Sequence, residues 1–299
     1  MINAWDNPGV FERIIGIFRQ LKGIIESRLF QQKRLKLNQD RTQKKEDLMK
    51  IAIVTGGSNG IGKATALELG KRGISVILTY NSYKDRAEAV VKEIEKNKGV
   101  RAVALKLDLT QISTFEGFVL EVKKSLKEIW NRTTFDYLVN NGGVGGPMMF
   151  TEMSEEYFDK ILNTNFKGPV FFTQHLVRFM DDAGAIVNTT STSKNQSSPG
   201  YSAYGSLKAA LSSWTRYVAK ELAPRKIRVN AVSPGPTHSN FGDGAFDKHP
   251  EFIRPLAEQS VFGRIGQPED LAKVIVNLLS DDFGWVTAQD IEVSGGYLL

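Results

Sequence analysis

The chain contains no cysteine among its 299 residues. It therefore forms no disulfide, offers no thiolate metal ligand and has no cysteine nucleophile, and it fits a reducing compartment such as the cytoplasm. Histidine is also scarce: His175, His238 and His249 do not show the spacing of metal ligands, so we expect no metal site.

Long apolar runs are missing too. No segment approaches the length of a membrane span, and the first residues lack the apolar core and cleavage site of a secretory signal. The content of 41% hydrophobic and 24% charged residues is that of an ordinary globular protein.

The positive charge is concentrated at one end. The net charge is +6, and residues 1–48 hold 10 Lys/Arg against 6 Asp/Glu, so +4 of it lies there and +2 remains for the rest. The basic pI therefore does not indicate a nucleic-acid partner for the main body.

Residues 1–48 are predicted to be a basic N-terminal extension. Apolar residues recur at helical spacing from Phe11 to Leu29, and a polar linker follows. The helix could lie on a membrane surface, pack on the core or on a neighbouring subunit, or be disordered upstream sequence. Glu12 and Glu26 weaken the membrane interpretation, so we favour packing or disorder.

From residue 49 to residue 299, β-type and helical patterns alternate, with helices expected at 60–72 and 83–98. The strand candidates are Ile51–Thr55, Ile74–Tyr80, Val100–Leu107, Phe135–Asn140, Ala185–Thr189, Ile227–Val232 and Asp290–Val293. This alternation predicts one α/β domain, a Rossmann-like doubly wound parallel sheet.

A glycine-rich turn follows the first predicted strand. Its sequence is Thr55-Gly56-Gly57-Ser58-Asn59-Gly60-Ile61-Gly62. Glycines let the backbone approach a pyrophosphate, and the following helix offers unpaired N–H groups, so the turn predicts dinucleotide binding.

The Gly-x-x-x-Gly-x-Gly spacing resembles the short-chain dehydrogenase/reductase family, and the rest of 49–299 continues the resemblance in order. Asp108 matches an adenine contact, although it could simply cap the next helix. Asn140-Asn141-Gly142-Gly143 matches a motif after the fourth strand, with Gly142 in place of alanine, and its asparagines could be turn formers. Pro234-Gly235 and Gly295-Gly296 match later motifs.

The resemblance implies a cofactor site. Its expected residues are Gly56, Ser58, Asn59, Gly60, Ile61, Gly62, Tyr80, Asn81, Ser82, Asp108, Leu109, Asn141, Gly142, Gly143, Tyr204, Lys208, Pro234, Gly235, Thr237 and Ser239.

The chemistry is expected at Tyr204 and Lys208, which lie four residues apart and so one helical turn apart on one face. A nearby ammonium favours the phenolate, which would lower the tyrosine pKa towards a range useful for proton transfer. Ser191 stands upstream at the family interval, and its hydroxyl would orient the substrate oxygen. If the alignment with the family motif is shifted by one residue, Thr190 takes the place of Ser191 as the substrate contact.

The resemblance adds Asn165 as the fourth catalytic residue, which in relatives holds a water on a proton path from Lys208. Asn163 competes for the position, but the following Gly168 selects Asn165. Together these residues predict reversible hydride transfer between a nicotinamide and a carbonyl or alcohol substrate. One alternative is a catalytically silent nucleotide sensor on the same fold. The other is a sugar-nucleotide epimerase of the related branch whose members have longer chains.

We expect a preference for NADP(H), with NAD(H) possible. The position that carries an acid in NAD sites falls on Tyr80, and neither Asn81 nor Ser82 would repel a 2′-phosphate. Lys84 and Arg86 lie nearby, whereas Asn59 stands where many NADP-using relatives carry a cation.

The substrate is not specified by the sequence. Residues 241–262 match the family's variable substrate segment; they are fairly apolar, and Arg254 is a candidate anion contact. Relatives suggest a homotetramer or dimer, built through the helices containing Asn165 and Tyr204 and through the last strand.

Overall fold

The structure is a computed structural model, and it describes residues 49–299 except residue 240. One seven-stranded sheet runs through it in the order β3-β2-β1-β4-β5-β6-β7, and all its neighbouring strands are parallel. The strands are β1 Ile51–Val54, β2 Ser75–Tyr80, β3 Ala102–Lys106, β4 Phe135–Asn140, β5 Met180–Thr189, β6 Arg228–Pro234 and β7 Asp290–Val293. The predicted doubly wound α/β fold is confirmed, and Lys50–Leu299 forms one compact unit.

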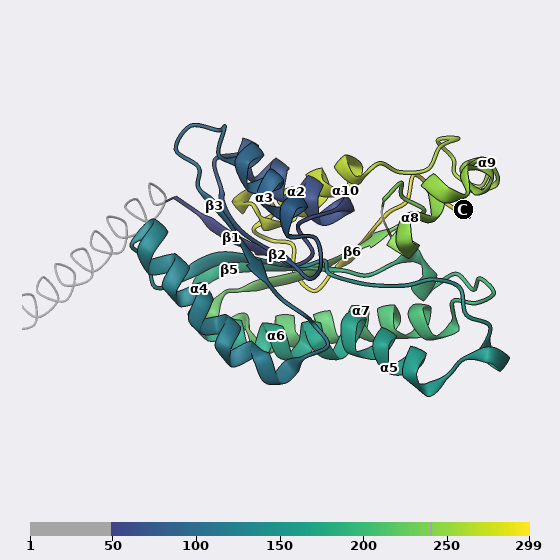
Figure 1. Cartoon of the computed structure of the whole chain (residues 1–299), viewed down its shortest axis with the longest axis horizontal. Coiled ribbons are helices and arrows are strands. Elements are labelled where there is room, and N and C mark those ends of the chain that lie inside the picture. The colour runs from purple at the N-terminus through teal and green to yellow at the C-terminus, as the bar shows by residue number, and fades with distance from the viewer. Residues whose placement is uncertain (1–48, 240) are drawn as a thin grey trace, which may run out of the picture. The chain divides into compact units, whose positions relative to one another are not determined.

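Helices cover both faces of the sheet (Figure 1). One face carries α2 Gly60–Lys71, α3 Lys84–Ile94 and α10 Pro268–Leu279, and the other carries α4 Phe115–Trp130, α6 Gly168–Leu176 and α7 Ser202–Glu221. The remaining α-helices are α5 Glu155–Leu162, α8 Phe241–Lys248 and α9 Ile253–Glu258. No helix of the described part of the chain is both long and apolar enough to span a membrane.

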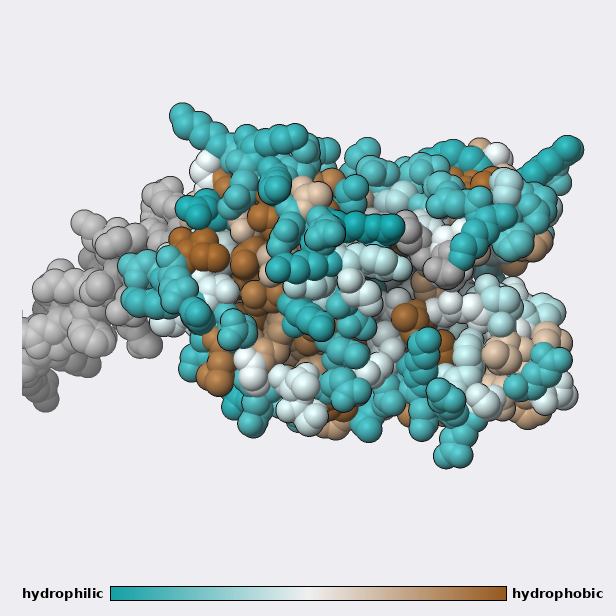
Figure 2. Space-filling view, viewed as in Figure 1, coloured by the Kyte–Doolittle hydropathy of each residue, from teal (hydrophilic) through white to brown (hydrophobic). Residues whose placement is uncertain are grey.

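The continuous apolar strands result from this burial on two sides. All four residues of β1 are fully buried. Because alternate side chains of a strand point to opposite faces, Ile51 and Ile53 enter one core and Ala52 and Val54 enter the other. Figure 2 shows apolar side chains gathered between the two helical layers, where the edge of the sheet meets the surface.

Strand β1 marks the point where the chain direction across the sheet reverses, since it pairs with β2 on one side and β4 on the other. In doubly wound sheets a crevice opens at this point, beyond the carboxyl ends of the strands. The glycine-rich turn lies there, directly after β1.

Two expected boundaries were wrong by more than two residues. The helix expected to reach residue 98 ends at Ile94, where the Asn97 side chain donates to the Ile94 carbonyl at 2.8 Å and competes with helix continuation. Strand β5 begins at Met180 rather than Ala185, and the pairing with β4 shifts register in this added stretch. The predictions for residues 1–48 lie outside the described residues.

Candidate active site

A cavity of about 1510 Å³ opens at the carboxyl ends of the strands. Most expected cofactor residues line it: Gly56, Ser58, Asn59, Gly60, Ile61, Asn81, Ser82, Asp108, Leu109, Asn141, Gly142, Gly143, Tyr204, Lys208, Pro234, Gly235, Thr237 and Ser239. Gly62 and Tyr80 do not. Tyr80 packs against the apolar core instead, so the residues after it, Asn81 and Ser82, face the cavity.

The glycine turn has the form that a pyrophosphate site requires. A Cβ atom on Gly62 would lie 2.3 Å from the Gly56 carbonyl oxygen, so Gly62 is needed for close packing of helix α2 although it does not face the cavity. Gly60 begins α2 with a φ of +50°, and the free N–H groups of the first helical turn follow it. This cradle fits the diphosphate of a dinucleotide.

Thr55, which the sequence did not single out, joins the glycine turn to the loop after β4. Its Oγ1 accepts hydrogen bonds from the main-chain N–H groups of Asn141 and Gly142, both at 2.9 Å. The Asn141 side chain donates to the Thr55 carbonyl oxygen at 3.1 Å. A Cβ atom on Gly142, where the family motif has alanine, would lie 2.8 Å from Leu109 Cδ1, so the end of the Leu109 side chain would have to shift.

Asp108 does not cap the next helix, which is preceded by Gln111, but it stabilises the turn before that helix. Its Oδ1 accepts from the Thr110 main-chain N–H at 2.9 Å and lies 2.7 Å from the Thr110 hydroxyl, which stabilises the turn after β3. It also lines the cavity, next to Leu109.

The chemical residues meet at the other side of the cavity. Ser191 follows β5, and its hydroxyl lies beside the phenol of Tyr204 on α7, where it favours the phenolate. The Lys208 ammonium lies 5.6 Å from the centre of the Tyr204 ring and donates to the Thr189 carbonyl oxygen at 2.8 Å. All three side chains line the cavity, and each is at most 9% exposed.

The electrostatics differ from the expectation. Burial raises the pKa of Tyr204 above its usual value, and the hydrogen bond from Ser191 offsets only part of this rise. Burial also lowers the pKa of Lys208 to about 8. The expected lowering of the Tyr204 pKa by Lys208 is therefore not found, because desolvation outweighs it in this closed site.

Asn165 lies just behind the cavity, fully buried in a π-helical turn, Asn163–Lys167. Its side-chain amide donates to the carbonyl oxygens of Val144 and Ile161 at 2.8 and 3.0 Å. Its Oδ1 has no hydrogen-bond partner among the described residues. A Cβ atom on Gly143 would lie 2.9 Å from this oxygen and 3.7 Å from Lys208 Nζ, so Asn165 Oδ1 and the ammonium flank the same glycine.

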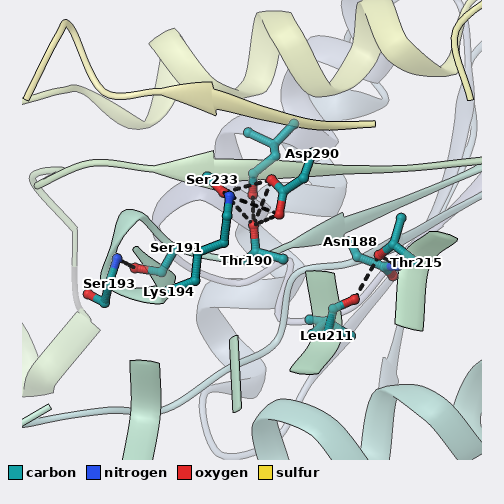
Figure 3. Close-up of polar contacts among 10 residues, drawn as sticks. Asn188, Thr190, Ser191, Ser193, Lys194, Leu211, Thr215, Ser233 and Asp290 are labelled. Carbon is teal, nitrogen blue, oxygen red and sulfur yellow. Dashed lines mark hydrogen bonds and ion pairs between the residues drawn. The ribbon is translucent and has the colours of Figure 1, made fainter. Parts of the chain in front are cut away.

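Thr190, the fallback for Ser191, is occupied elsewhere. Its hydroxyl lies 2.7 Å from Ser233 Oγ and 3.0 Å from both the Val232 carbonyl oxygen and Asp290 Oδ1 (Figure 3). A hydroxyl held this way serves the packing of β5 against β6 and β7. The geometry therefore favours Ser191 as the substrate contact.

The segment 241–262 forms α8 and α9 and closes the cavity with apolar side chains. The apolar side chains that line it are Phe241, Ala245, Phe246, Phe252, Pro255 and Leu256. Arg254 does not line it: its guanidinium pairs with Glu258 at 2.8 Å, one helical turn away, so its expected anion contact was wrong.

Comparison with known proteins agrees with this geometry. A family model described as enoyl-(acyl carrier protein) reductase matches residues 56–298. A 3-oxoacyl-[acyl-carrier-protein] reductase of Staphylococcus epidermidis is 36% identical over 250 residues, which is 83% of this chain and 98% of that protein.

Solved structures give the same result. The reductase LugOII of lugdunomycin biosynthesis superposes with a TM-score of 0.80 at 37% identity, covering 84% of this chain and 99% of that one. The angucycline C-6 ketoreductase LanV, solved with bound NADP, reaches a TM-score of 0.79 at 36% identity, covering 84% and 97%. The chain therefore belongs to the short-chain dehydrogenase/reductase family and is an NAD(P)-dependent oxidoreductase.

Proposed function

We propose that the protein is a ketoreductase in which Tyr204 protonates the substrate oxygen while Ser191 orients it. The observation that carries this proposal is that the Ser191 and Tyr204 side chains and Lys208 line one cavity, which also holds the glycine cradle. The alternative of a catalytically silent sensor finds no support, since both Tyr204 and Lys208 face that cavity.

The raised pKa of Tyr204 favours the reductive direction. A phenol that stays protonated at neutral pH is a proton donor, and reduction needs one proton on the oxygen for each hydride on the carbon. The bound dinucleotide supplies that hydride. Ser191 donates a hydrogen bond to the carbonyl oxygen, and Lys208, one helical turn from Tyr204, lies where an ammonium stabilises negative charge developing on the phenol oxygen.

We propose that proton resupply runs past Lys208 and Asn165. The Lys208 pKa of about 8 allows this side chain to exchange a proton near neutrality. The unpartnered Asn165 Oδ1 is an acceptor on the same path, close to Gly143.

Two features support NADP(H) as the cofactor. Asn81 and Ser82 line the cavity after β2 without a carboxylate that would repel a 2′-phosphate. The Arg86 guanidinium lies beside them: it donates to Asn59 Oδ1 at 3.2 Å and stacks over the Tyr83 ring at 4.5 Å. Arg86 thus places a positive charge beside the glycine turn, where many NADP-using relatives carry a cation at the position of Asn59. The NADP-bound relative LanV agrees with this assignment.

A cyclic or aromatic ketone is the substrate class that the lining favours. The Phe241 and Tyr201 rings lie 5.4 and 6.2 Å from the Tyr204 ring, so aromatic side chains border the catalytic tyrosine and can pack against a ring of the substrate. The angucycline ketoreductase and the hydroxynaphthalene reductase-like relatives point the same way. A 3-oxoacyl thioester is the second candidate, favoured by the Staphylococcus relative.

Assembly and location stay proposals. A homotetramer or dimer through α7 and the C-terminal segment is supported by exposed apolar side chains there, among them Tyr217 and Leu299. Cytoplasmic location rests on the absence of cysteine.

The Tyr204→Phe variant tests the catalytic proposal. The ring stays in its place, so NADPH binding measured by fluorescence should be unchanged within about twofold. The kcat for ketone reduction should fall by about 10²- to 10⁴-fold, because the proton donor is gone. A kcat within a few-fold of the unaltered enzyme would refute the role of Tyr204.

A further inference from the structure

A largely buried ion pair lies beside the catalytic loop and takes no part in the proposed chemistry. Lys194 Nζ and Asp290 Oδ2 are 3.0 Å apart, with side chains 11% and 12% exposed. The two residues lie almost a hundred positions apart in sequence: Lys194 ends the short 3-10 helix after Ser191, and Asp290 begins the edge strand β7.

The pair is the centre of a hydrogen-bonded cluster (Figure 3). Lys194 Nζ also donates to Ser233 Oγ on β6, and Ser233 Oγ donates to Asp290 Oδ1 at 2.6 Å. The Thr190 hydroxyl lies 3.0 and 3.1 Å from the two Asp290 oxygens. One carboxylate thus contacts groups from the ends of β5 and β6 and from the loop between β5 and α7.

The carboxylate is ionised in this setting. Burial opposes its ionisation, but hydrogen bonds from Ser212 and Ser233 and the contact with Lys194 outweigh burial and hold the pKa of Asp290 below its usual value. The Lys194 ammonium therefore faces a full negative charge at neutral pH.

Two of the residues that contact Asp290 flank Ser191 in the chain. Thr190 comes directly before it and Lys194 three residues after it, and both contact Asp290. Between them, the Ser191 hydroxyl accepts from the Ser193 N–H at 3.2 Å, within the same short turn. Both ends of this turn are consequently held by one side chain of the edge strand.

We propose that Asp290 and Lys194 are positioning residues, which hold the Ser191 hydroxyl in place beside Tyr204 in the cavity. This inference rests on the proposed role of Ser191. A displacement of about 1 Å in a catalytic group costs on the order of a hundredfold in rate, so a loosened turn should slow catalysis without loss of cofactor binding.

The test is a double-mutant cycle between Asp290→Asn and Ser191→Ala. Asp290→Asn keeps the shape of the side chain and removes its charge. In the unaltered background we expect kcat to fall about 10- to 100-fold, with the NADPH Kd by fluorescence unchanged within about twofold. In the Ser191→Ala background the same change should alter kcat by less than about twofold, since there is no hydroxyl left to position.

A matched control lies at the other end of β5. Arg132 and Asp181 form a comparable pair at 2.7 Å, far from Ser191 along the strand. Asp181→Asn should lower the melting temperature about as much as Asp290→Asn and leave kcat unchanged. Lys194→Met provides a second variant that leaves the Asp290 contacts with Ser233 intact, and its effect on kcat should also vanish in the Ser191→Ala background.

The outcomes separate the two claims. If Asp290→Asn lowers kcat equally in both backgrounds, or if Asp181→Asn lowers it as much, the cluster is only structural and this inference fails. If neither Asp290→Asn nor Lys194→Met folds, the pair belongs to the fold and the inference also fails. If Ser191→Ala itself keeps full kcat, the proposed role of Ser191 is wrong.

Discussion

The Lys208 ammonium donates to the main-chain oxygen of Thr189 at 2.8 Å, which joins the middle of α7 to the last residue of β5. The contact is buried, and a main-chain oxygen compensates a desolvated charge only in part, so the pKa of Lys208 is lowered to about 8. This contact holds the Lys208 ammonium next to Tyr204, and the burial of its charge lowers the free energy of unfolding of the protein.

Replacement of Lys208 by methionine should therefore stabilise the fold and abolish turnover. The folded-state pKa of about 8 lies below the usual 10.5, so at pH 7 the folded state bears the full penalty of a buried charge. We expect the free energy of unfolding of Lys208→Met to exceed that of the unaltered protein by on the order of 2 kcal/mol at pH 7. Urea denaturation measures it.

The pH dependence provides the control for this prediction. Between pH 8 and 10.5 the folded protein releases the Lys208 proton while the unfolded chain keeps it, so the stability of the unaltered protein rises with pH in that window. The advantage of Lys208→Met should shrink accordingly by pH 10. A methionine variant that is less stable at pH 7 would contradict the assignment of a desolvated ammonium.

The Arg86→Gln variant should weaken NADPH binding selectively. The guanidinium beside Asn59 and Tyr83 is the cation that we propose for the 2′-phosphate, and the loss of such a charge-assisted hydrogen bond would weaken binding by about tenfold or more in Kd. The Kd for NADH should stay unchanged, as fluorescence titration with both cofactors would show. Lys84→Gln is the matched control, because Lys84 is a neighbouring cation that pairs with Glu88. An equal loss for NADH and NADPH would rule out the 2′-phosphate contact.

The Phe241→Ala variant should discriminate between substrate classes. The Phe241 ring packs on Gly145, since a Cβ atom on Gly145 would lie 2.3 Å from the ring. The same ring lies 5.4 Å from the Tyr204 ring. Loss of this ring should raise the KM for a bicyclic aromatic ketone about tenfold and leave that for a small 3-oxoacyl thioester within about twofold. Phe262→Ala, in an exposed phenylalanine outside the cavity, is the control. The opposite pattern would favour the thioester.

A variant that starts at Met49 should keep kcat, cofactor affinity and subunit count. The cavity-lining residues of the described part of the chain lie between Gly56 and Tyr297, and all the proposed catalytic residues lie after Met49. Steady-state kinetics and light scattering measure the three properties, with the full chain as reference. An insoluble or inactive variant would show that the extension is structural, and sedimentation of the full chain alone with anionic vesicles would revive the membrane interpretation.

The sequence by itself determined the fold and most of the site, because both depend on local spacing. Apolar strands with helices between them specify a sheet covered on both faces, and Gly56–Gly62 can only be a tight turn before a helix. Tyr204 and Lys208 are placed on one face by helical periodicity alone.

Only the tertiary structure decided what depends on distant neighbours. Burial reverses the expected pKa shift of Tyr204, and nothing in Tyr-x-x-x-Lys records how much water surrounds the pair. Arg86 reaches Asn59 across 27 residues, and Asp290 reaches Lys194 across nearly a hundred. Such contacts arise where parallel strands from separate parts of the chain end at one edge of the sheet, so a pattern of neighbouring residues carries no signal of them.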